Sequence, residues 1–531
     1  MPPTTSDVWK YFTRANDRKS AKCNLCETTL AYSGGTSNLR NHLNGKHPSI
    51  NSGNTDDTKK QTSLSAFVST PKKVSSSESE KITQWIANMV VMDYMPLSVV
   101  EGEGFLSLMN TVVPVYNVPS RNTIRSRIVK RYDSEKDLLK SSLASVSSVA
   151  ITTDTWTSNA TESYITATEH HIDNEWRMRS NVLLTRAMPE RHTGANLARK
   201  LQDCISEFGL VGKVETCVHD NARNMDCAGR ICDEWSDLGC FGHTLQLCIK
   251  PALELQSVSK TVAKCRKLVG HFKHSTTLTA EMRKRQVTLG APEHELQQDV
   301  VTRWNSTYYM LQRVSEQRRV LTDIMLDTSI TSKNDSALLL KDHEWDIISD
   351  LCDVLRILTD VTTYMCSDQY VSCSEIYPIV FGLINGCLKR TSDDSGLIAK
   401  VKDTIRGEFI RRFKPDSVDT ASTVPMLASL LDPKYKRLGF LTREQRKATH
   451  EMLESKIDEM PLRISRESDS EPTPKRRKLD FLCIESPEKD DSSDEIMCYL
   501  SEKIYKDVDT LEWWKNNEHR FPKIALIAKR F

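Results

Sequence analysis

Two cysteines and two histidines near the amino end restrict this chain more than any other feature. Cys23 and Cys26 stand two residues apart, and His42 and His47 complete the pattern C-x2-C-x15-H-x4-H. Two thiolates and two imidazoles are a ligand set that a tetrahedral Zn2+ ion takes at about 2.0 to 2.3 Å. Neither the spacing nor the ligand set is common by chance. The pattern therefore predicts one structural Zn2+ site, held by Cys23, Cys26, His42 and His47.

The predicted site organises residues 1–50 as a small zinc finger. A turn carries the cysteines, and a helix over residues 36–47 delivers both histidines. A unit of fewer than about 50 residues cannot build a sufficient core alone, so the metal must contribute to its folding free energy. Trp9, Tyr11 and Phe12 lie just upstream and are expected to provide its apolar cover.

The same fifty residues are locally basic. Seven lysines and arginines against three acidic residues give a balance of +4, whereas the whole chain carries only +2. Cations near a phosphate add salt-dependent affinity for double-stranded DNA through counterion release, although any single one can equally be a solvated surface charge. Thr36 at the helix start is a further candidate for the major-groove edge. The residues predicted to contact DNA are Arg14, Lys19, Lys22, Ser37, Asn38, Arg40 and Lys46.

Length and composition bound the remaining possibilities. With 531 residues the chain is expected to form about three or four domains. No stretch approaches the ~20 consecutive apolar residues of a membrane helix, and the amino end lacks a secretory signal, so no membrane partner is expected. The thiols should therefore meet a reducing compartment.

Composition also divides the chain into segments, which predict a multidomain α+β protein. A Ser/Thr-rich linker follows the finger, then a small helical domain, an α/β core, a large all-helical insertion and a charged disordered loop. The predicted ranges are 1–50 (finger), 51–80 (linker), 81–140 (helical domain), 141–310 (core), 311–462 (insertion), 463–493 (loop) and 494–531 (carboxyl-terminal region).

Two aspartates in the α/β segment stand at the ends of predicted strands. Asp154 ends the strand AITTD, and Asp220 ends ETCVHD. Two carboxylates at the carboxyl ends of adjacent strands would converge on a divalent cation such as Mg2+, as two-metal phosphoryl transfer requires. An aspartate at a strand end is also common as a turn or helix cap, so each has a purely structural alternative.

These segments together resemble two known families. The finger resembles a BED-type zinc finger, a DNA-binding module attached to transposases and to host regulators descended from them. The body is similar to hAT-family transposases, which implies a ribonuclease H-like fold interrupted by the helical insertion. The motifs that carry this resemblance, in chain order, are AITTDTWTS, ETCVHDNARNM, CFGHTLQL, DVVTRWNSTYYML, ASLLDPKYK and LEWWKNNEHRFPKIALIAKRF.

The resemblance assigns roles to particular residues. Asp154 and Asp220 correspond to catalytic Mg2+ ligands for DNA strand cleavage and transfer. Trp304 matches the tryptophan of the Arg-Trp motif, which can stack with an extruded base; a core tryptophan is the alternative. Cys240 and His243 form the C-x2-H motif, and because two ligands do not make a structural zinc site, we expect local packing and hydrogen bonding there.

One departure from the family pattern bears on activity. The family's third metal-binding carboxylate belongs to a Ser-Glu-Arg motif after the WW…FP stretch, and this chain ends at Phe531 without it. The core is therefore expected to be catalytically silent, with Mg2+ relevant only if it is active. The dimerisation region is likewise expected to be incomplete, which would weaken a homo-oligomer and leave Trp513 and Trp514 without their full apolar partner.

A basic run in the charged loop indicates the compartment. Lys475, Arg476, Arg477 and Lys478 are consecutive and flanked by proline, as a nuclear import receptor requires, although such a run can also be a solubilising cluster. The sequence thus predicts a nuclear, zinc-dependent DNA-binding protein of transposase ancestry that acts in transcriptional regulation. The alternatives are a working DNA transposase and a protein-interaction scaffold.

Overall fold

The structure is a computed structural model that describes residues 6–16, 19–47, 74–366, 373–459 and 491–531. The chain divides into two compact units, residues 1–131 and 132–531, which are considered separately below. The basic run at 475–478 and most of the predicted linker lie outside the described residues, so the interpretations placed on them remain predictions. No helix in the described ranges has both the length and the hydropathy of a membrane span.

The finger is a three-stranded antiparallel sheet followed by one helix. Its strands are β1 (Phe12–Arg14), β2 (Ser20–Cys23) and β3 (Thr29–Ala31), and α1 covers Ser37–Lys46. Five side chains form its buried core, namely Val8, Phe12, Ala21, Cys23 and Leu39. Trp9 and Tyr11 pack against this core half-buried, which confirms the apolar cover expected of the upstream aromatic residues.

A small helical region follows, as the sequence predicts for residues 81–140. It contains α2 (Ser76–Met92), α3 (Glu103–Val112) and α4 (Arg121–Ala144). A capping box starts α2, in which the Ser75 side chain accepts from the Glu78 backbone and Glu78 accepts from the Ser75 backbone. The hydroxyls of Thr83 and Tyr116 hydrogen-bond to each other at 2.7 Å in the interior, so each of these two buried groups has a partner.

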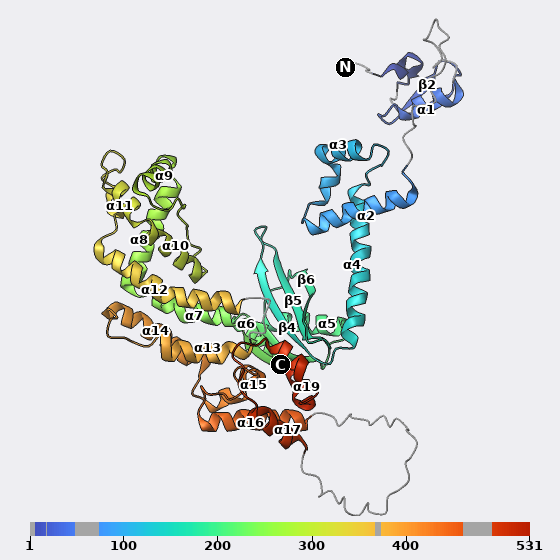
Figure 1. The fold of residues 1–531 in the computed structure, drawn as a ribbon. Helices are drawn as coiled ribbons and strands as arrows, with labels where there is room; N and C mark the ends of the chain where they lie inside the picture. Colours follow the sequence, from blue (N-terminus) through green and yellow to red (C-terminus); the bar gives the residue numbers. More distant parts are fainter. Residues whose placement is uncertain (1–5, 17–18, 48–73, 367–372, 460–490) are drawn as a thin grey trace, which may run out of the picture. The chain divides into compact units, whose positions relative to one another are not determined.

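The second unit is built on a mixed five-stranded sheet. Its strands are β4 (Val149–Thr157), β5 (Ser163–Ile172), β6 (Met178–Ala187), β7 (Val214–His219) and β8 (Ser236–Gly239), in the order β6-β5-β4-β7-β8. Figure 1 labels β4, β5 and β6 next to one another. The pairs β6-β5 and β5-β4 are antiparallel, and β4-β7 and β7-β8 are parallel. Each parallel pair needs a crossover, which α5 (Gly194–Glu207) and α6 (Arg223–Cys232) provide. These strands and helices confirm the predicted α/β core.

No strand follows β8 in the described residues, where helices are joined by loops. The switch from strands to helices thus lies near residue 240, whereas the sequence predicts the boundary between core and helical insertion at 311. The helices from 241 onward carry the same helical apolar spacing as those beyond 311. These helices are α7 (Phe241–Leu253), α8 (Gln256–Lys273), α9 (Thr276–Leu289), α10 (Trp304–Glu316), α11 (Arg318–Leu326), α12 (Asp342–Met365), α13 (Ile376–Gly382), α14 (Gly396–Phe413), α15 (Val424–Leu431) and α16 (Arg443–Asp458).

The last helices return to the sheet. They are α17 (Asp491–Ser501), α18 (Thr510–Asn517) and α19 (Pro522–Arg530), and α19 contacts β5. Trp513 and Trp514 of α18 are 4% and 1% exposed. The expectation that they lack a full apolar partner is therefore wrong. The β5–β6 hairpin supplies part of that partner, since Trp176 stacks on Trp514 with ring centroids 5.8 Å apart.

We expect Trp514→Ala to destabilise the second unit by about 3–5 kcal/mol, the usual cost of truncating a large buried aromatic side chain. The substitution also removes the hydrogen bond that the indole Nε1 donates to the Leu431 carbonyl at 2.9 Å. Urea unfolding of the full chain, followed by circular dichroism, measures the loss. Leu526→Ala on the exposed side of α19 is the control and should change stability by under about 0.5 kcal/mol. Equal midpoints for the two variants would contradict this account.

Candidate metal centre and nucleic-acid interface

The four predicted zinc ligands meet at one point of the finger. The ligand atoms of Cys23, Cys26, His42 and His47 all lie within 4.8 Å of one another. The Cys26 sulfur lies 3.1 Å from His42 Nε2, and the Cys23 sulfur lies 3.7 Å from His47 Nε2. Bond lengths of about 2.0–2.3 Å in a tetrahedron place ligand atoms about 3.3–3.8 Å apart, so the four groups fit one Zn2+ ion.

Local backbone structure positions both pairs of ligands. The cysteine turn closes on itself because the Glu27 amide donates to the Cys23 carbonyl at 2.9 Å, with Glu27 in the left-handed region at φ 62°. His42 lies within α1, and His47 directly follows its last residue. Leu39 anchors this helix in the core with no exposed surface. The helix therefore presents both imidazoles to the turn.

The chemistry of Cys26 also suits a metal ligand. The side-chain hydroxyl and the backbone amide of Thr28 hydrogen-bond to its sulfur and lower the pKa of Cys26 to about 5. Cys26 is therefore a thiolate at neutral pH, which is the form that binds zinc. Cys23 is buried and Cys26 is exposed, so the centre lies at the edge of the finger core.

The predicted DNA-contacting residues lie on two parts of the finger. Ser37, Asn38, Arg40 and Lys46 are exposed on α1, and Lys19 and Lys22 are exposed on or beside β2. Lys22 forms an ion pair with Glu27 at 3.6 Å. The exposed cations of α1 leave a basic helix face available to a phosphate backbone, and base contacts by Ser37 or Asn38 remain predictions.

Arg14 is held more firmly than a solvated cation would be. Its guanidinium carbon lies 4.7 Å from the centroid of the Trp9 ring and 4.5 Å from that of Tyr32. It also donates a hydrogen bond of 2.6 Å to the Tyr32 hydroxyl. Cation–π contacts of this kind fix the direction of the side chain. Arg14 is thus part of the aromatic cover of the finger, and its contact with DNA remains a prediction.

In the second unit the sheet brings Asp154 and Asp220 together. The parallel register of β4 and β7 pairs Thr152 with Val218, and the two aspartates follow two residues later on each chain. Asp220 directly follows the last residue of β7, whereas Asp154 lies inside β4, which continues to Thr157 and therefore does not end at Asp154 as expected. Side chains alternate along a strand, so Asp154 shares the face of Thr152. This is the arrangement expected for a shared divalent cation.

Each carboxylate also makes a local hydrogen bond. The Thr155 amide donates to Asp154 at 2.8 Å, and the Ala222 amide donates to Asp220 at 3.2 Å. Among the residues that the structure describes, only the Cys2His2 cluster gathers three or more side chains of metal-ligand type. No third side chain of that type therefore joins the aspartates within these ranges. Their role as Mg2+ ligands remains a prediction.

Three further motif residues lie at the starts of two helices, α7 and α10. The Cys240 amide donates to the His219 carbonyl at 2.7 Å and the Cys240 carbonyl caps the start of α7, where His243 lies in the first turn. These are backbone contacts, so the packing role expected of the Cys240 and His243 side chains remains a prediction. Trp304 begins α10 and is 4% exposed, with its backbone amide bonded to Gln246 at 3.1 Å. The ring belongs to the core in this structure, so its predicted stacking on a base would require it to become exposed.

Asp299, in the same motif as Trp304, is buried and has its hydrogen-bond partners in the structure. Asp299 accepts hydrogen bonds of 2.8 and 3.0 Å from the Arg266 guanidinium and one of 2.9 Å from Thr307. Burial disfavours its ionisation, but these hydrogen bonds outweigh burial and lower the pKa of Asp299. The motif around Asp299, Arg303 and Trp304 is thus fixed by an ionised, fully partnered side chain.

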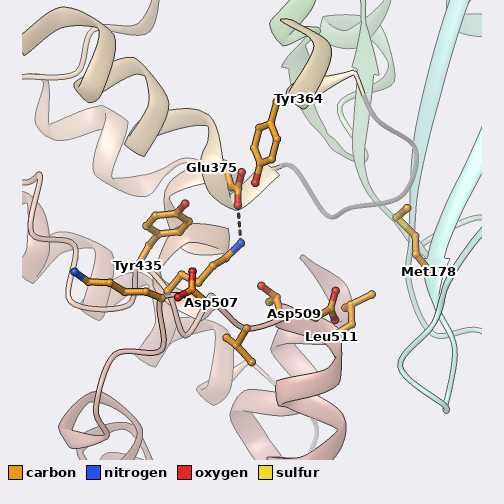
Figure 2. A pocket seen from close by; sticks show the side chains of 11 residues that line it. Met178, Tyr364, Glu375, Tyr435, Asp507, Asp509 and Leu511 are labelled. Carbon is orange, nitrogen blue, oxygen red and sulfur yellow. Dashed lines mark hydrogen bonds and ion pairs between the residues drawn. The ribbon is translucent and has the colours of Figure 1, made fainter. Parts of the chain in front are cut away.

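A hollow of about 380 Å³ lies elsewhere in the second unit. Figure 2 shows Glu375 between Tyr364 and Tyr435 and joined to a lysine, which is Lys434 at 2.6 Å. Burial and a hydrogen bond to Glu375 raise the pKa of Tyr364 to about 12. No predicted site residue lines this hollow, and its central carboxylate is already neutralised. It is a packing junction and not the candidate site.

Comparison with known protein families assigns the segments. Residues 6–48 match the BED zinc finger and residues 69–117 the Hermes transposase DNA-binding domain. Residues 152–237 match the ZBED1 RNase-like domain, and residues 238–354 match the ZBED1 RNase-like helical domain. The chain thus combines a segment similar to the BED zinc finger with segments similar to the ZBED1 RNase-like domains.

Full-length relatives are of two kinds. The chain is 24% identical to human zinc finger BED domain-containing protein 4 over 99% of its length, and spans 48% of that protein. It is 25% identical to the putative AC transposase of maize, covering 99% of this chain and 70% of the relative. It is 26% identical to the Arabidopsis thaliana zinc finger BED domain-containing protein DAYSLEEPER, covering 99% of this chain and 81% of the relative.

One element was missed by sequence reasoning. Residues 69–117 match a DNA-binding domain, whereas residues 51–80 were expected to be a linker and residues 81–140 only a helical domain. A search for basic patches could not find it, because this range carries three lysines against five acidic residues. The helical apolar spacing in this range predicts that the segment folds into helices, but it does not predict what the segment binds.

We expect the purified chain to contain one zinc ion and to lose it when Cys26 is changed to Ser, since the serine hydroxyl is not a thiolate ligand. Elemental analysis of the metal per chain tests this. Cys498→Ser is the matched control, because Cys498 is an exposed cysteine outside the cluster. Equal zinc content in the two variants would exclude the assigned site.

Proposed function

We propose that the chain is a nuclear DNA-binding protein that recognises double-stranded DNA through its zinc finger and regulates transcription. The observation that carries the proposal is the convergence of four zinc ligands in a BED finger with a basic, exposed helix face. The second DNA-binding match at residues 69–117 supports the same partner. Lys475–Lys478 supply the proposed contact with a nuclear import receptor.

Catalytic silence of the core is part of this proposal. Its support is that Asp154 and Asp220 gather no third metal ligand within the described ranges, whereas a site that holds metal ions and polarises a phosphodiester needs further ligands. A protein of this kind would keep the fold of a transposase and use it as a scaffold. The association of copies through the carboxyl-terminal region remains a proposal as well.

A DNA transposase is the second candidate function. The register that places Asp154 of β4 beside the end of β7, which Asp220 directly follows, favours it, as does the similarity to the putative maize transposase. In that case the two carboxylates would hold Mg2+, which would activate the attacking water or hydroxyl and stabilise the leaving oxygen. The protein-interaction scaffold has no specific observation in its favour.

Arg40→Ala should weaken DNA binding about equally for different sequences and reduce the slope of log K against log salt by about 1, as loss of one phosphate contact does. Fluorescence anisotropy with a labelled duplex at several salt concentrations measures this slope. Arg199→Ala removes an exposed arginine from α5 and serves as the control. An unchanged slope for Arg40→Ala would remove Arg40 from the proposed interface.

The two candidate functions differ in strand cleavage. If the core is silent, the full chain with Mg2+ should not nick a duplex that carries a transposon end, and Asp154→Asn should behave like the unaltered chain. A gel-based nicking assay reads out both. Nicking that disappears in Asp154→Asn would establish the transposase and refute catalytic silence.

A further inference from the structure

We propose that Cys240 and Cys366 form a reversible disulfide bond, which makes this pair of thiols a site of oxidation in the second unit. The proposal is independent of DNA binding and of any metal. The two cysteines lie far apart in the chain, but both of their sulfur atoms lie beside Gly242 of α7. A Cβ atom added to Gly242 would be 3.9 Å from the Cys240 sulfur and 3.6 Å from the Cys366 sulfur. The two sulfurs are therefore neighbours around one point of the backbone.

The ends of two helices bring the thiols together. Cys240 directly precedes α7, and Cys366 directly follows the last residue of α12. The helices α7 and α12 contact each other and lie side by side in Figure 1. A disulfide needs sulfur atoms about 2.0 Å apart and Cα atoms about 4.4–6.8 Å apart. Because the backbone at a helix end is held by fewer hydrogen bonds, rotation of the side chains and a small backbone shift can close the remaining distance.

Accessibility distinguishes this pair from the core cysteines of the second unit. Cys366 is exposed and Cys240 is half-buried, so a small oxidant can reach both. Burial raises the pKa of the Cys366 thiol, and the charge of a Cys240 thiolate raises it further, as expected of two thiols that interact electrostatically. By contrast, burial raises the pKa of Cys217, Cys248 and Cys265 to about 12, and such buried thiols are inert.

The oxidant belongs to the class of small disulfides, of which glutathione disulfide is an example. One cysteine thiolate attacks a sulfur of the oxidant, forms a mixed disulfide and releases one glutathione thiolate. The second cysteine thiolate then attacks the protein sulfur of the mixed disulfide, the second glutathione leaves, and the bond between Cys240 and Cys366 forms. The two cysteines lose two protons and two electrons, and the oxidant is reduced to two glutathione thiols. A thiol reductant reverses both steps, so in a reducing compartment the bond would be transient.

The bond would tie the helical part of the second unit to the end of its sheet. Cys240 directly follows β8, and its amide donates to the His219 carbonyl at the end of β7. On the other side, α12 packs on α10, which begins with Trp304. The bond would close the long loop between residues 240 and 366 and so restrict the unfolded chain. Oxidation should therefore stabilise the second unit and fix α12 against the sheet.

The test treats the folded full chain with glutathione disulfide until the exposed Cys498 carries glutathione, and then blocks the remaining thiols by alkylation. Mass spectrometry after proteolysis without reduction identifies the linked peptides. The link between Cys240 and Cys366 should be the main disulfide within the chain and should disappear on treatment with dithiothreitol. Oxidation should also raise the thermal midpoint by a few degrees. Cys366→Ser should abolish both the link and the rise, and glutathione should remain on Cys240 instead.

Cys387→Ser is the matched control. Cys387 is also exposed, and no lysine or arginine separates it from Cys366, so the two share a tryptic peptide. This variant should form the link as the unaltered chain does. Circular dichroism verifies that each variant is folded; if Cys366→Ser is not, the linked peptide of the unaltered chain decides. Absence of the link in a chain whose Cys498 is modified would overturn the proposal, as would links to Cys387 as frequent as those to Cys366.

Discussion

The parallel pairing of β4 with β7 is the constraint on which the chemistry of the second unit depends. The two strands are separated by a hairpin and by α5, and only their pairing brings Asp154 and Asp220 to one edge of the sheet. A shift of one residue in either strand would send one carboxylate to the opposite face, because side chains alternate. The buried residues Ile151 and Cys217 oppose each other in this register and face the core formed with α5 and α6, so core packing and site geometry are fixed together.

The carboxyl-terminal helices are integral to this arrangement. Asp432, after α15, accepts hydrogen bonds from Ser374 and from Thr510 at the start of α18, and Trp514 bonds to the carbonyl just before Asp432. Arg530 of α19 pairs with Glu215, the second residue of β7. Lys436 is fully buried and donates to the Tyr499 carbonyl at 2.7 Å, and burial lowers the pKa of Lys436 to about 8. Buried polar groups are costly unless they are partnered, and here their contacts join segments that are far apart in the chain. The pair of Arg530 with Glu215 reaches the sheet itself.

The sequence predicted those features that a local pattern determines. Ligand spacing was sufficient for the zinc cluster, and the strand runs that precede Asp154 and Asp220 were sufficient to predict an α/β core. Features that depend on distant contacts were not accessible. The burial of Trp514 depends on Trp176, far away in the chain, and the burial of Trp304 depends on helices whose packing no local pattern specifies.

The finger and the sheet of the second unit depend on different physical forces for their folding. The finger has five buried side chains among its described residues, so its fold depends on the metal, and its cations act on phosphates in a way that salt screens. The sheet packs on a larger apolar core that needs no metal. Removal of zinc would thus unfold the finger and leave the sheet and its two aspartates in place. A protein that had lost strand cleavage could therefore keep the DNA binding of its finger, since the finger needs no catalytic carboxylates.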